Sequence, residues 1–408
     1  TESKTMFREV KLGGPAKGPL SGVRVADFSA VFSGPICASI LADQGADVIK
    51  IESFEGDLMR RGLPQQDGMG SAFVTMNRNK RSLALDLSSA AGKAIASKLI
   101  MSCDVVIENF RPGVMDRLEL GYRQFQEEHP KLVYVSINGV GAVGPYSGRR
   151  VYDAVIQAIS GFSALKGDEK PEMVDTLICD KITSLTAAEA TVAALFQAER
   201  SGKGQLVEVS MLDSALSFLW PDTMNNFTFL EGENEWVDYL DHSVFLHETK
   251  DGWIATMPVQ DREVKAAFKA LELDELIEDP RFVDQPSRAR HRSELRALAN
   301  EAYRKFTTDE LCEKLETEDV PYSRLNNRKE VIQDPQIAAM GALLKYEDPG
   351  AGSIRTPRPP AQFNETPSNI RRAAPRLGEH SREVLAEIGY PEEEIQTFIN
   401  QKIVTSVS

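Results

Sequence analysis

One carboxylate in the chain stands where a nucleophile could be held. Asp180 follows the short apolar run 177–179 and precedes a long predicted helix, residues 182–201. The dipole at a helix N-terminus stabilises an anion and also favours a nearby thiolate or oxyanion. Asp is also a common N-cap residue, and taken alone the pattern favours a cap over a carboxylate that attacks an activated carbonyl group. Asp153 and Asp175 compete for the role of nucleophile.

A second stretch matches a nucleotide-binding pattern. Residues 139–144 have the spacing GxGxxG and follow a predicted strand. A dinucleotide site needs a helix directly after the glycine turn and an acidic residue about 20 positions later. Residues 145–150 are instead typical of a loop, and no acidic residue fits that second position well. The pattern therefore indicates a flexible glycine loop that covers a pocket, and it argues against a nicotinamide cofactor.

The elements around these residues predict the fold class. Residues 23–28 and 47–51 read as strands on either side of a helix at 35–43. This βαβ unit indicates a parallel sheet, and the alternation continues to a strand at 205–210. Beyond residue 225, polar clusters and charge-rich helical segments replace it, which indicates a second, smaller domain.

Composition limits the classes of partner. The chain has 61 Asp and Glu against 47 Lys and Arg, a net charge of −14, so attraction to nucleic acid or an anionic membrane is weak. No apolar run reaches the roughly 18 residues of a membrane helix, and residues 1–4 lack the apolar core of a signal peptide. The 4 cysteines are too scattered for a disulfide framework or a CxxC metal site. We expect a cytoplasmic protein with no metal, nucleic-acid or membrane partner.

Several separated motifs occur in an order that closely resembles the family III CoA-transferases (the CaiB/BaiF family), and acyl-CoA racemases share this fold. The resemblance covers nearly the whole chain. Its motifs are residues 19–28, 31–35, 41–52, 77–83, 106–113, 201–205 and 211–213, with further similarity at 321–344 and 377–380.

The resemblance implies an α/β fold with a Rossmann-like large domain and a smaller inserted α+β domain. The large domain would comprise residues 1–224 and 326–408, and the small domain residues 225–325. A proline-rich arm at 346–375 would return the chain to the large domain, which would end in a helix at 381–388. Two identical chains would form an interlocked dimer.

The implied activity is transfer of CoA from an acyl-CoA donor, with succinyl-CoA as one candidate, to a free carboxylic acid. Asp180 corresponds to the family's nucleophile. It would attack the thioester to form a mixed anhydride, and the released CoA thiolate would convert this anhydride into an aspartyl-CoA thioester. The acceptor acid would reverse both steps. Such chemistry needs no permanently bound cofactor, because the CoA thioester is itself the substrate.

Two alternatives remain open. A racemase of this fold would use a His–Asp pair where this chain has Tyr152–Asp153, and the 5 histidines lie elsewhere. Tyr, with a reference pKa near 10, is a poor base at neutral pH. The chain could also be a non-catalytic CoA-binding subunit that works only in a heteromer with a homologous chain.

The resemblance also implies CoA-binding positions. Arg117 would meet CoA phosphates and Arg150 is a second basic position, since a guanidinium suits phosphate geometry. The full implied set is Val31, Phe32, Ser33, Leu85, Asn109, Phe110, Arg117, Arg150, Tyr152 and Asp153. A further basic cluster, Arg78, Lys80 and Arg81, has two open interpretations: attraction of CoA phosphates, or pairing with nearby carboxylates.

Overall fold

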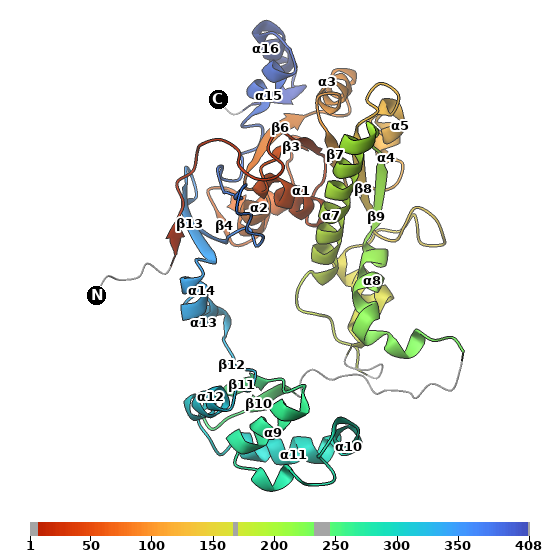
Figure 1. The fold of residues 1–408 in the computed structure, drawn as a ribbon. Helices are drawn as coiled ribbons and strands as arrows, with labels where there is room; N and C mark the ends of the chain where they lie inside the picture. Colours follow the sequence, from red (N-terminus) through yellow and green to blue (C-terminus); the bar gives the residue numbers. More distant parts are fainter. Residues whose placement is uncertain (1–6, 166–169, 232–244, 407–408) are drawn as a thin grey trace. The chain divides into compact units, whose positions relative to one another are not determined.

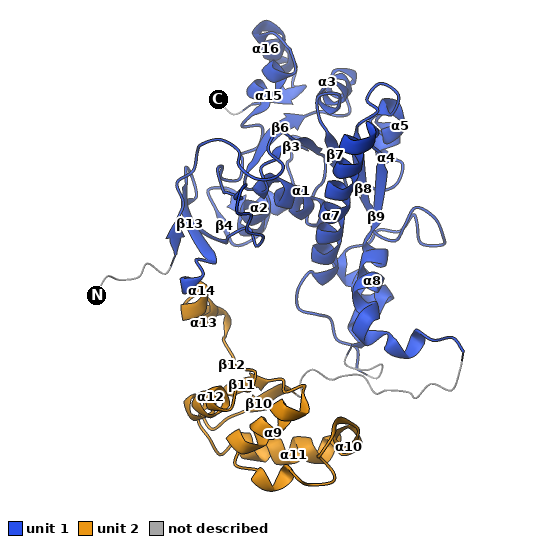
Figure 2. Cartoon of the chain, viewed as in Figure 1, with its two compact units in different colours: residues 1–237, 338–408 blue, residues 238–337 orange. Residues whose placement is uncertain are grey.

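The computed structural model describes residues 7–165, 170–231 and 245–406. The chain forms two compact units (Figure 2). The large unit comprises residues 1–237 and 338–408, and the small unit comprises residues 238–337. Both divisions lie later in the chain than the domain boundaries expected from composition.

A seven-stranded sheet organises the large unit (Figure 1). Its strand order is β15-β6-β3-β2-β7-β8-β9, and every neighbouring pair is parallel except β15 with β6. The expected parallel-rich sheet is therefore confirmed. The strands are β2 (Arg24–Asp27), β3 (Asp47–Glu52), β6 (Lys80–Leu85), β7 (Val105–Glu108), β8 (Val133–Asn138), β9 (Leu206–Ser210) and β15 (Val404–Thr405).

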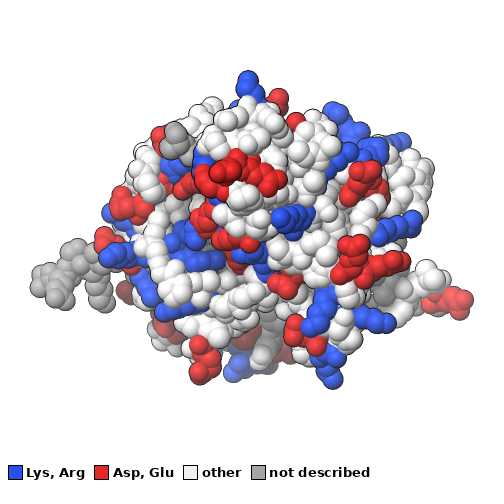
Figure 3. Space-filling view, turned by 90° about the horizontal axis from the view of Figure 1, so that it is seen from above, with Lys and Arg blue, Asp and Glu red and all other residues white. Residues whose placement is uncertain are grey.

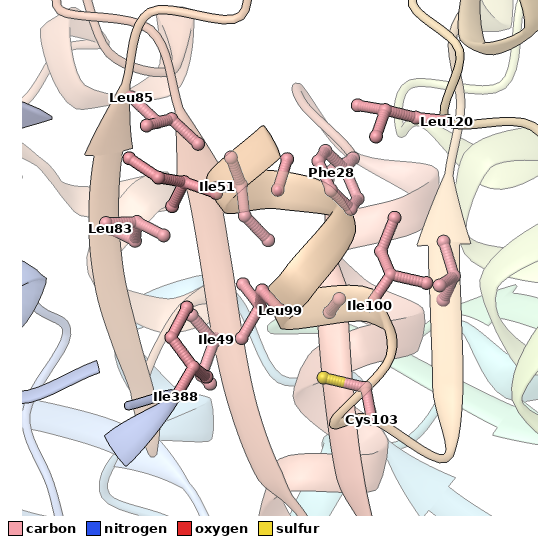
Figure 4. Close-up of a cluster of buried hydrophobic side chains, with 14 of the residues drawn as sticks. Phe28, Ile49, Ile51, Leu83, Leu85, Leu99, Ile100, Cys103, Leu120 and Ile388 are labelled. Carbon is pink, nitrogen blue, oxygen red and sulfur yellow. The ribbon is translucent and has the colours of Figure 1, made fainter. Parts of the chain in front are cut away.

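Both faces of this sheet are covered, because alternate side chains of each strand point to opposite sides. Val48 belongs to the core beneath α1 (Ser33–Asp43) and α7 (Ile178–Ser201), while Ile49 belongs to the opposite core. Figure 4 shows part of the second core, where Ile49 and Leu99 lie close together. This side is covered by α3 (Ala90–Ile100), α15 (Ser381–Glu387) and α16 (Glu392–Asn400).

The segment predicted as an extended arm is partly a sheet, so that prediction is wrong for its first half. β13 (Leu343–Asp348) pairs antiparallel with β14 (Gly352–Pro357) and parallel with β1 (Arg8–Glu9). Tyr346, Ile354 and Thr356 are of types that favour strands. Their strand propensity decides the structure here, despite the prolines scattered through the segment. Residues 358–375 contain neither helix nor strand.

The remaining elements of the large unit are shorter than α7, and two of them, α6 (Asp153–Ser160) and α8 (Met211–Thr223), pack against it. The other helices are α2 (Ser71–Met76), α4 (Val114–Arg117) and α5 (Tyr122–Phe125), and the strands β4 (Gln65–Gln66) and β5 (Met69–Gly70) pair with each other. No helix in the described ranges combines the length and apolarity that a membrane span requires.

The small unit is an α+β structure with its own core. Its antiparallel sheet has the order β10 (Leu246–Glu248), β11 (Trp253–Thr256) and β12 (Tyr322–Arg324). The helices are α9 (Asp261–Ala270), α10 (Gln285–Arg290), α11 (Arg292–Tyr303), α12 (Thr308–Thr317) and α13 (Arg328–Val331), and α14 (Pro335–Ala339) crosses the division between the units. Phe268, Phe282 and Leu311 are among its buried residues.

Candidate active site

The strand order marks where a ligand cleft should lie. The chain proceeds from β2 outward through β3 to β6, then returns to β7 on the other side of β2. Open α/β sheets bind ligands at such a switch point, outside the carboxyl ends of the strands. The loops that follow β2 and β7 are residues 28–32 and 109–113. They carry four of the expected CoA positions, Val31, Phe32, Asn109 and Phe110.

A cavity of about 420 Å³ lies at this switch point. Among the described residues, Asp180, from the first turn of α7, is the one acidic residue that lines it. The walls come from the loops after β2, β7 and β8 and from the segment before α6. The lining residues are Ala30, Val31, Phe32, Ser33, Asn109, Phe110, Arg111, Pro112, Ile137, Asn138, Gly139, Val140, Gly141, Ser147, Arg149, Arg150, Val151, Tyr152, Asp180 and Met211.

Asp180 is held between the N-termini of two long helices. It is the third residue of α7, and Ser33, the first residue of α1, lines the same cavity. The hydroxyl and backbone N–H of Ser33 act on the Asp180 carboxylate as donor groups. Burial and the neighbouring charge of Asp153 raise the pKa of Asp180 from 3.8 to about 6, although the bonds from Ser33 act in the opposite direction. A carboxylate of this pKa is ionised at neutral pH and more basic than an ordinary aspartate, as a nucleophile requires.

Asp153 lies beneath the cavity rather than in its wall. It is the first residue of α6 and is 2% exposed. One carboxylate oxygen accepts the backbone N–H of Asp180 at 3.0 Å, and the other accepts the Gln157 side-chain amide at 2.6 Å. Asp153 therefore caps the first turn of α7, the role that the sequence pattern had favoured for Asp180.

The loops after β2 and β7 are tied together across the switch point. Asn109 accepts the backbone N–H of Ala30 at 2.9 Å and donates its side-chain amide to the Ala30 carbonyl oxygen at 2.8 Å. Glu108 accepts the backbone N–H of Phe110 at 2.8 Å. Burial raises the pKa of Glu108 to about 7. These bonds hold Asn109 and Phe110 in the cavity wall.

Leu85 lines a second cavity, of about 590 Å³. This cavity lies at the ends of β3 and β6 and shares Ala30 and Phe110 with the first. Arg117 lines neither cavity and is exposed on α4. Leu85 thus lies in the neighbouring cavity, and Arg117 lies in neither. The expected positions that line the same cavity as Asp180 are Val31, Phe32, Ser33, Asn109, Phe110, Arg150 and Tyr152.

Two cavity arginines, Arg111 and Arg149, were missed in the sequence. Both adjoin predicted positions, so the motifs at 109–113 and 149–153 contained the signal. Arg149 stacks on Tyr146, with its guanidinium carbon 3.8 Å from the ring centroid. Within the described ranges, neither these two nor Arg150 forms an ion pair, so all three remain available to an anionic ligand.

The basic cluster at 78–81 has another role. Arg78 pairs with Asp43 at 2.7 Å, Lys80 with Asp27 at 2.8 Å and Arg81 with Asp47 at 2.6 Å. All three cations are buried, so their charge is balanced inside the protein. Of the two open interpretations, the structure supports pairing. Figure 3 shows charges of both signs interspersed on one face of the molecule, with no extended basic surface in that view.

The glycine-rich stretch forms part of the cavity wall through Gly139 and Gly141. A Cβ atom at Gly139 would lie 1.9 Å from Cγ2 of Val151, so the close approach of these two segments requires glycine. No helix follows until α6 begins at Asp153. The stretch therefore lacks the helix N-terminus of a dinucleotide site, as its sequence indicated.

Comparison with known proteins agrees with this geometry. The model of CoA-transferase family III matches residues 20–381. The chain belongs to this family. A succinate–glutarate CoA-transferase from Agrobacterium fabrum is 33% identical over 388 residues, covering 91% of this chain and 96% of that protein. The beta subunit of a succinyl-CoA–L-malate CoA-transferase from Chloroflexus aurantiacus is 29% identical over 401 residues, covering 95% and 98%.

A solved structure has the same fold. The crystal structure of a CAIB/BAIF family protein from Brucella suis superposes with a TM-score of 0.78 at 30% identity, covering 91% of this family III chain and 100% of that one. The family includes transferases with carboxylate substrates. In the described residues, the cavity of this CoA-transferase family member is lined by one carboxylate and three arginines. In the described residues, no group of three or more His, Cys, Asp or Glu side chains is arranged to hold a metal ion.

Proposed function

We propose that this protein transfers CoA from an acyl-CoA to a free carboxylic acid through Asp180. The carboxylate attacks the thioester carbonyl, the C–S bond breaks, and an aspartyl anhydride and CoA thiolate form. The thiolate then attacks the aspartyl carbonyl, which releases the donor acid and leaves an aspartyl-CoA thioester. The acceptor carboxylate reverses the sequence and leaves as the new acyl-CoA. No net proton or electron transfer occurs.

The observation that carries this proposal is the placement of Asp180. It is the single acidic residue in the part of the cavity wall that the structure describes, and two helix N-termini converge on it. Each attack generates an oxyanion, and each expels or consumes an anion. Backbone N–H groups at helix N-termini stabilise such charges without the movement that solvent would require.

The two cavities suggest how CoA is held. We propose that the adenosine end occupies the cavity lined by Leu85 and that the pantetheine arm passes Ala30 and Phe110, which both cavities share. Arg150 would bind a phosphate. Arg117, exposed on the helix after the β7 loop, is proposed as a second phosphate contact at the open end.

The relatives favour succinyl-CoA as donor and a dicarboxylic acid as acceptor. Their names specify succinate with glutarate and succinyl-CoA with L-malate. In this chain, Arg111 and Arg149 would bind the carboxylate that does not react, because a guanidinium matches a carboxylate in a bidentate geometry.

We further propose that two copies assemble as an interlocked dimer. The described part of the large unit exposes an apolar stripe on α7: Leu185 is 62% exposed, Val192 39% and Phe196 63%. These residues share one helix face, and such a stripe is typical of a covered surface. The relative named as a beta subunit keeps a heteromer open as the alternative. Light scattering of the purified chain distinguishes a dimer from a monomer that needs a homologous partner.

The direct test is chemical trapping of the aspartyl intermediate. Incubation with succinyl-CoA and hydroxylamine should inactivate the wild type and modify Asp180, as read by peptide mass spectrometry. Asp180→Ala should abolish CoA transfer to glutarate. Asp213→Ala is the matched control, because Asp213 is the third residue of α8 as Asp180 is of α7 but does not line the cavity.

Full turnover by Asp180→Ala would refute the proposed nucleophile. Incorporation of solvent deuterium at the α-carbon of a chiral acyl-CoA would support a racemase instead. Among the described residues that line the cavity, the position before Asp153 is Tyr152 rather than the histidine of a racemase.

A further inference from the structure

The loop between β2 and α1 contains a strained residue. Val31 has φ +73°, in the left-handed region. A β-branched residue rarely adopts this conformation, which costs about 1–3 kcal/mol unless its surroundings compensate. Val31 lies two positions before Ser33, and both line the cavity wall with Asp180. The Ser184 hydroxyl of α7 lies within hydrogen-bond distance of the carbonyl oxygens of both Ser33, at 2.8 Å, and Asp180, at 2.6 Å.

A buried ion pair beneath the loop holds this conformation. The backbone N–H of Val31 donates to the carboxylate of Asp57, at 3.3 and 3.2 Å from its two oxygens. Lys50 Nζ lies 3.0 Å from Asp57 Oδ2 and donates to the Ser29 carbonyl oxygen at 2.8 Å. The side chains of Lys50 and Asp57 are 0% and 1% exposed. One ion pair therefore bonds to the loop at two points, the Ser29 carbonyl oxygen and the N–H of the strained residue itself.

The ion pair is itself fixed from outside the loop. Glu52 accepts the backbone N–H of Asp57 at 3.0 Å and is bound by Arg60 at 2.8 and 2.6 Å. Asp57 also accepts the backbone N–H of Met59 at 2.9 Å. Its carboxylate thus has a defined orientation before any substrate binds.

Stability alone does not account for such an arrangement. Burial of two charges costs desolvation energy that their attraction often only balances, and apolar replacements of such pairs are frequently neutral or stabilising. This pair instead holds a strained segment in the wall of the cavity that contains Asp180, which indicates a role in positioning. Strain persists only where surrounding bonds over-determine it.

We propose that Lys50 and Asp57 are positioning residues that keep Val31 in the left-handed conformation and thereby aim Ser33 at Asp180. This inference rests on the proposed role of Asp180 as nucleophile. The positioning residues touch neither substrate nor the reacting atoms. They act by keeping the loop in the geometry that presents the Ser33 donors.

The test is a rescue experiment on the full-length protein. Lys50→Met should slow single-turnover formation of the enzyme–CoA thioester about 10- to 100-fold, the range that corresponds to the strain no longer compensated. It should also shift the acid limb of the pH–rate profile to higher pH. The reason is that the displaced Ser33 donors no longer lower the pKa of Asp180. Val31→Gly in the same background should restore much of both, since glycine adopts positive φ without strain.

A matched control separates position from stability. Arg78 forms another buried ion pair, with Asp43, and lines neither cavity. Arg78→Met should lower thermal stability yet retain the rate and pH profile of the folded enzyme. Should Lys50→Met fail to fold, Lys50→Met/Asp57→Asn removes both charges and serves with Val31→Gly in the same comparison.

An unchanged rate and profile in the folded Lys50 variant would overturn the proposal. The proposal would also be overturned if the Lys50 variant were slowed and Val31→Gly did not restore its rate. That result would show that the ion pair supports the fold and does not act through the conformation of Val31. These outcomes are independent of the nucleophile test: thioester formation by Asp180→Ala would refute the proposed function, whereas a normal Lys50 variant beside an inactive Asp180→Ala would refute only the positioning role.

Discussion

Asp180→Asn should stabilise the folded protein while abolishing transfer. The wild-type carboxylate has a pKa raised to about 6 in the folded state, against 3.8 ordinarily, because burial and Asp153 oppose its ionisation. An acid with a raised folded pKa destabilises the native state as pH rises: the effect is absent below the unfolded pKa and complete above the folded pKa. The shift of about two pKa units corresponds to about 3 kcal/mol.

Chemical denaturation at two pH values measures this effect. The free energy of unfolding of Asp180→Asn should exceed that of the wild type by about 3 kcal/mol near pH 8 and by only about 1 kcal/mol near pH 4.5. Asparagine keeps a carbonyl oxygen for the Ser33 donors, so the variant removes charge with little change in shape. The gain at high pH is an upper estimate, because other contacts of the site relax.

Asp213→Asn is the control for loss of an aspartate at the third position of a helix. Asp213 is exposed, and its charge only complements the dipole of α8, so this variant should lose about 0.3–1 kcal/mol. A difference for Asp180→Asn that is negative, or that does not change between the two pH values, would show that Asp180 is not held at an electrostatic cost, and the reasoning from burial would fail.

Three further outcomes follow from the site. Asp153→Asn removes a charge that raises the pKa of Asp180, but it keeps an oxygen that can accept the backbone N–H of Asp180. The acid limb of the single-turnover rate should therefore shift to lower pH by on the order of one pH unit. A shift to higher pH would contradict this. Arg150→Ala should raise the KM for acyl-CoA about 10- to 100-fold, whereas Arg123→Ala, exposed on α5 outside both cavities, should change it less than about threefold. Gly34→Ala places a Cβ atom 2.2 Å from that of Ser29, so thermal melting should show a loss of about 1–3 kcal/mol; a neutral result would mean the loop relaxes freely.

The alternation of strands and helices made the parallel sheet predictable. β3, β7 and β8 are short, rich in β-branched residues and bounded by a helix or turn, and this local pattern needs no knowledge of distant contacts. Site residues on loops such as 31–33 and 109–110 were predictable for a related reason. They directly follow strands, and the ends of neighbouring parallel strands meet at one edge.

Long-range partners were beyond the sequence. The carboxylate that caps α7 comes from Asp153, 27 residues before the N–H it accepts, so the helix begins before Asp180 rather than after it. The bond between Asp57 and Val31 spans 26 residues. Neither has a local signature, since an acidic residue on a distant loop looks the same whether it is exposed or buried. Arg117 shows the converse: its sequence position is suggestive, yet its exposure follows from how α4 packs.

The division of the large unit into two sequence segments has a consequence for synthesis on the ribosome. Residues 238–337 are continuous and can fold as soon as they emerge, whereas the seven-stranded sheet needs β15, from residues 404–405, to cover β6. Until then Ala84 and Leu85 of β6 lack their strand partner, and such an unpaired edge favours association with other chains. Slow translation or a truncation before β15 should therefore direct nascent chains to chaperones or aggregates.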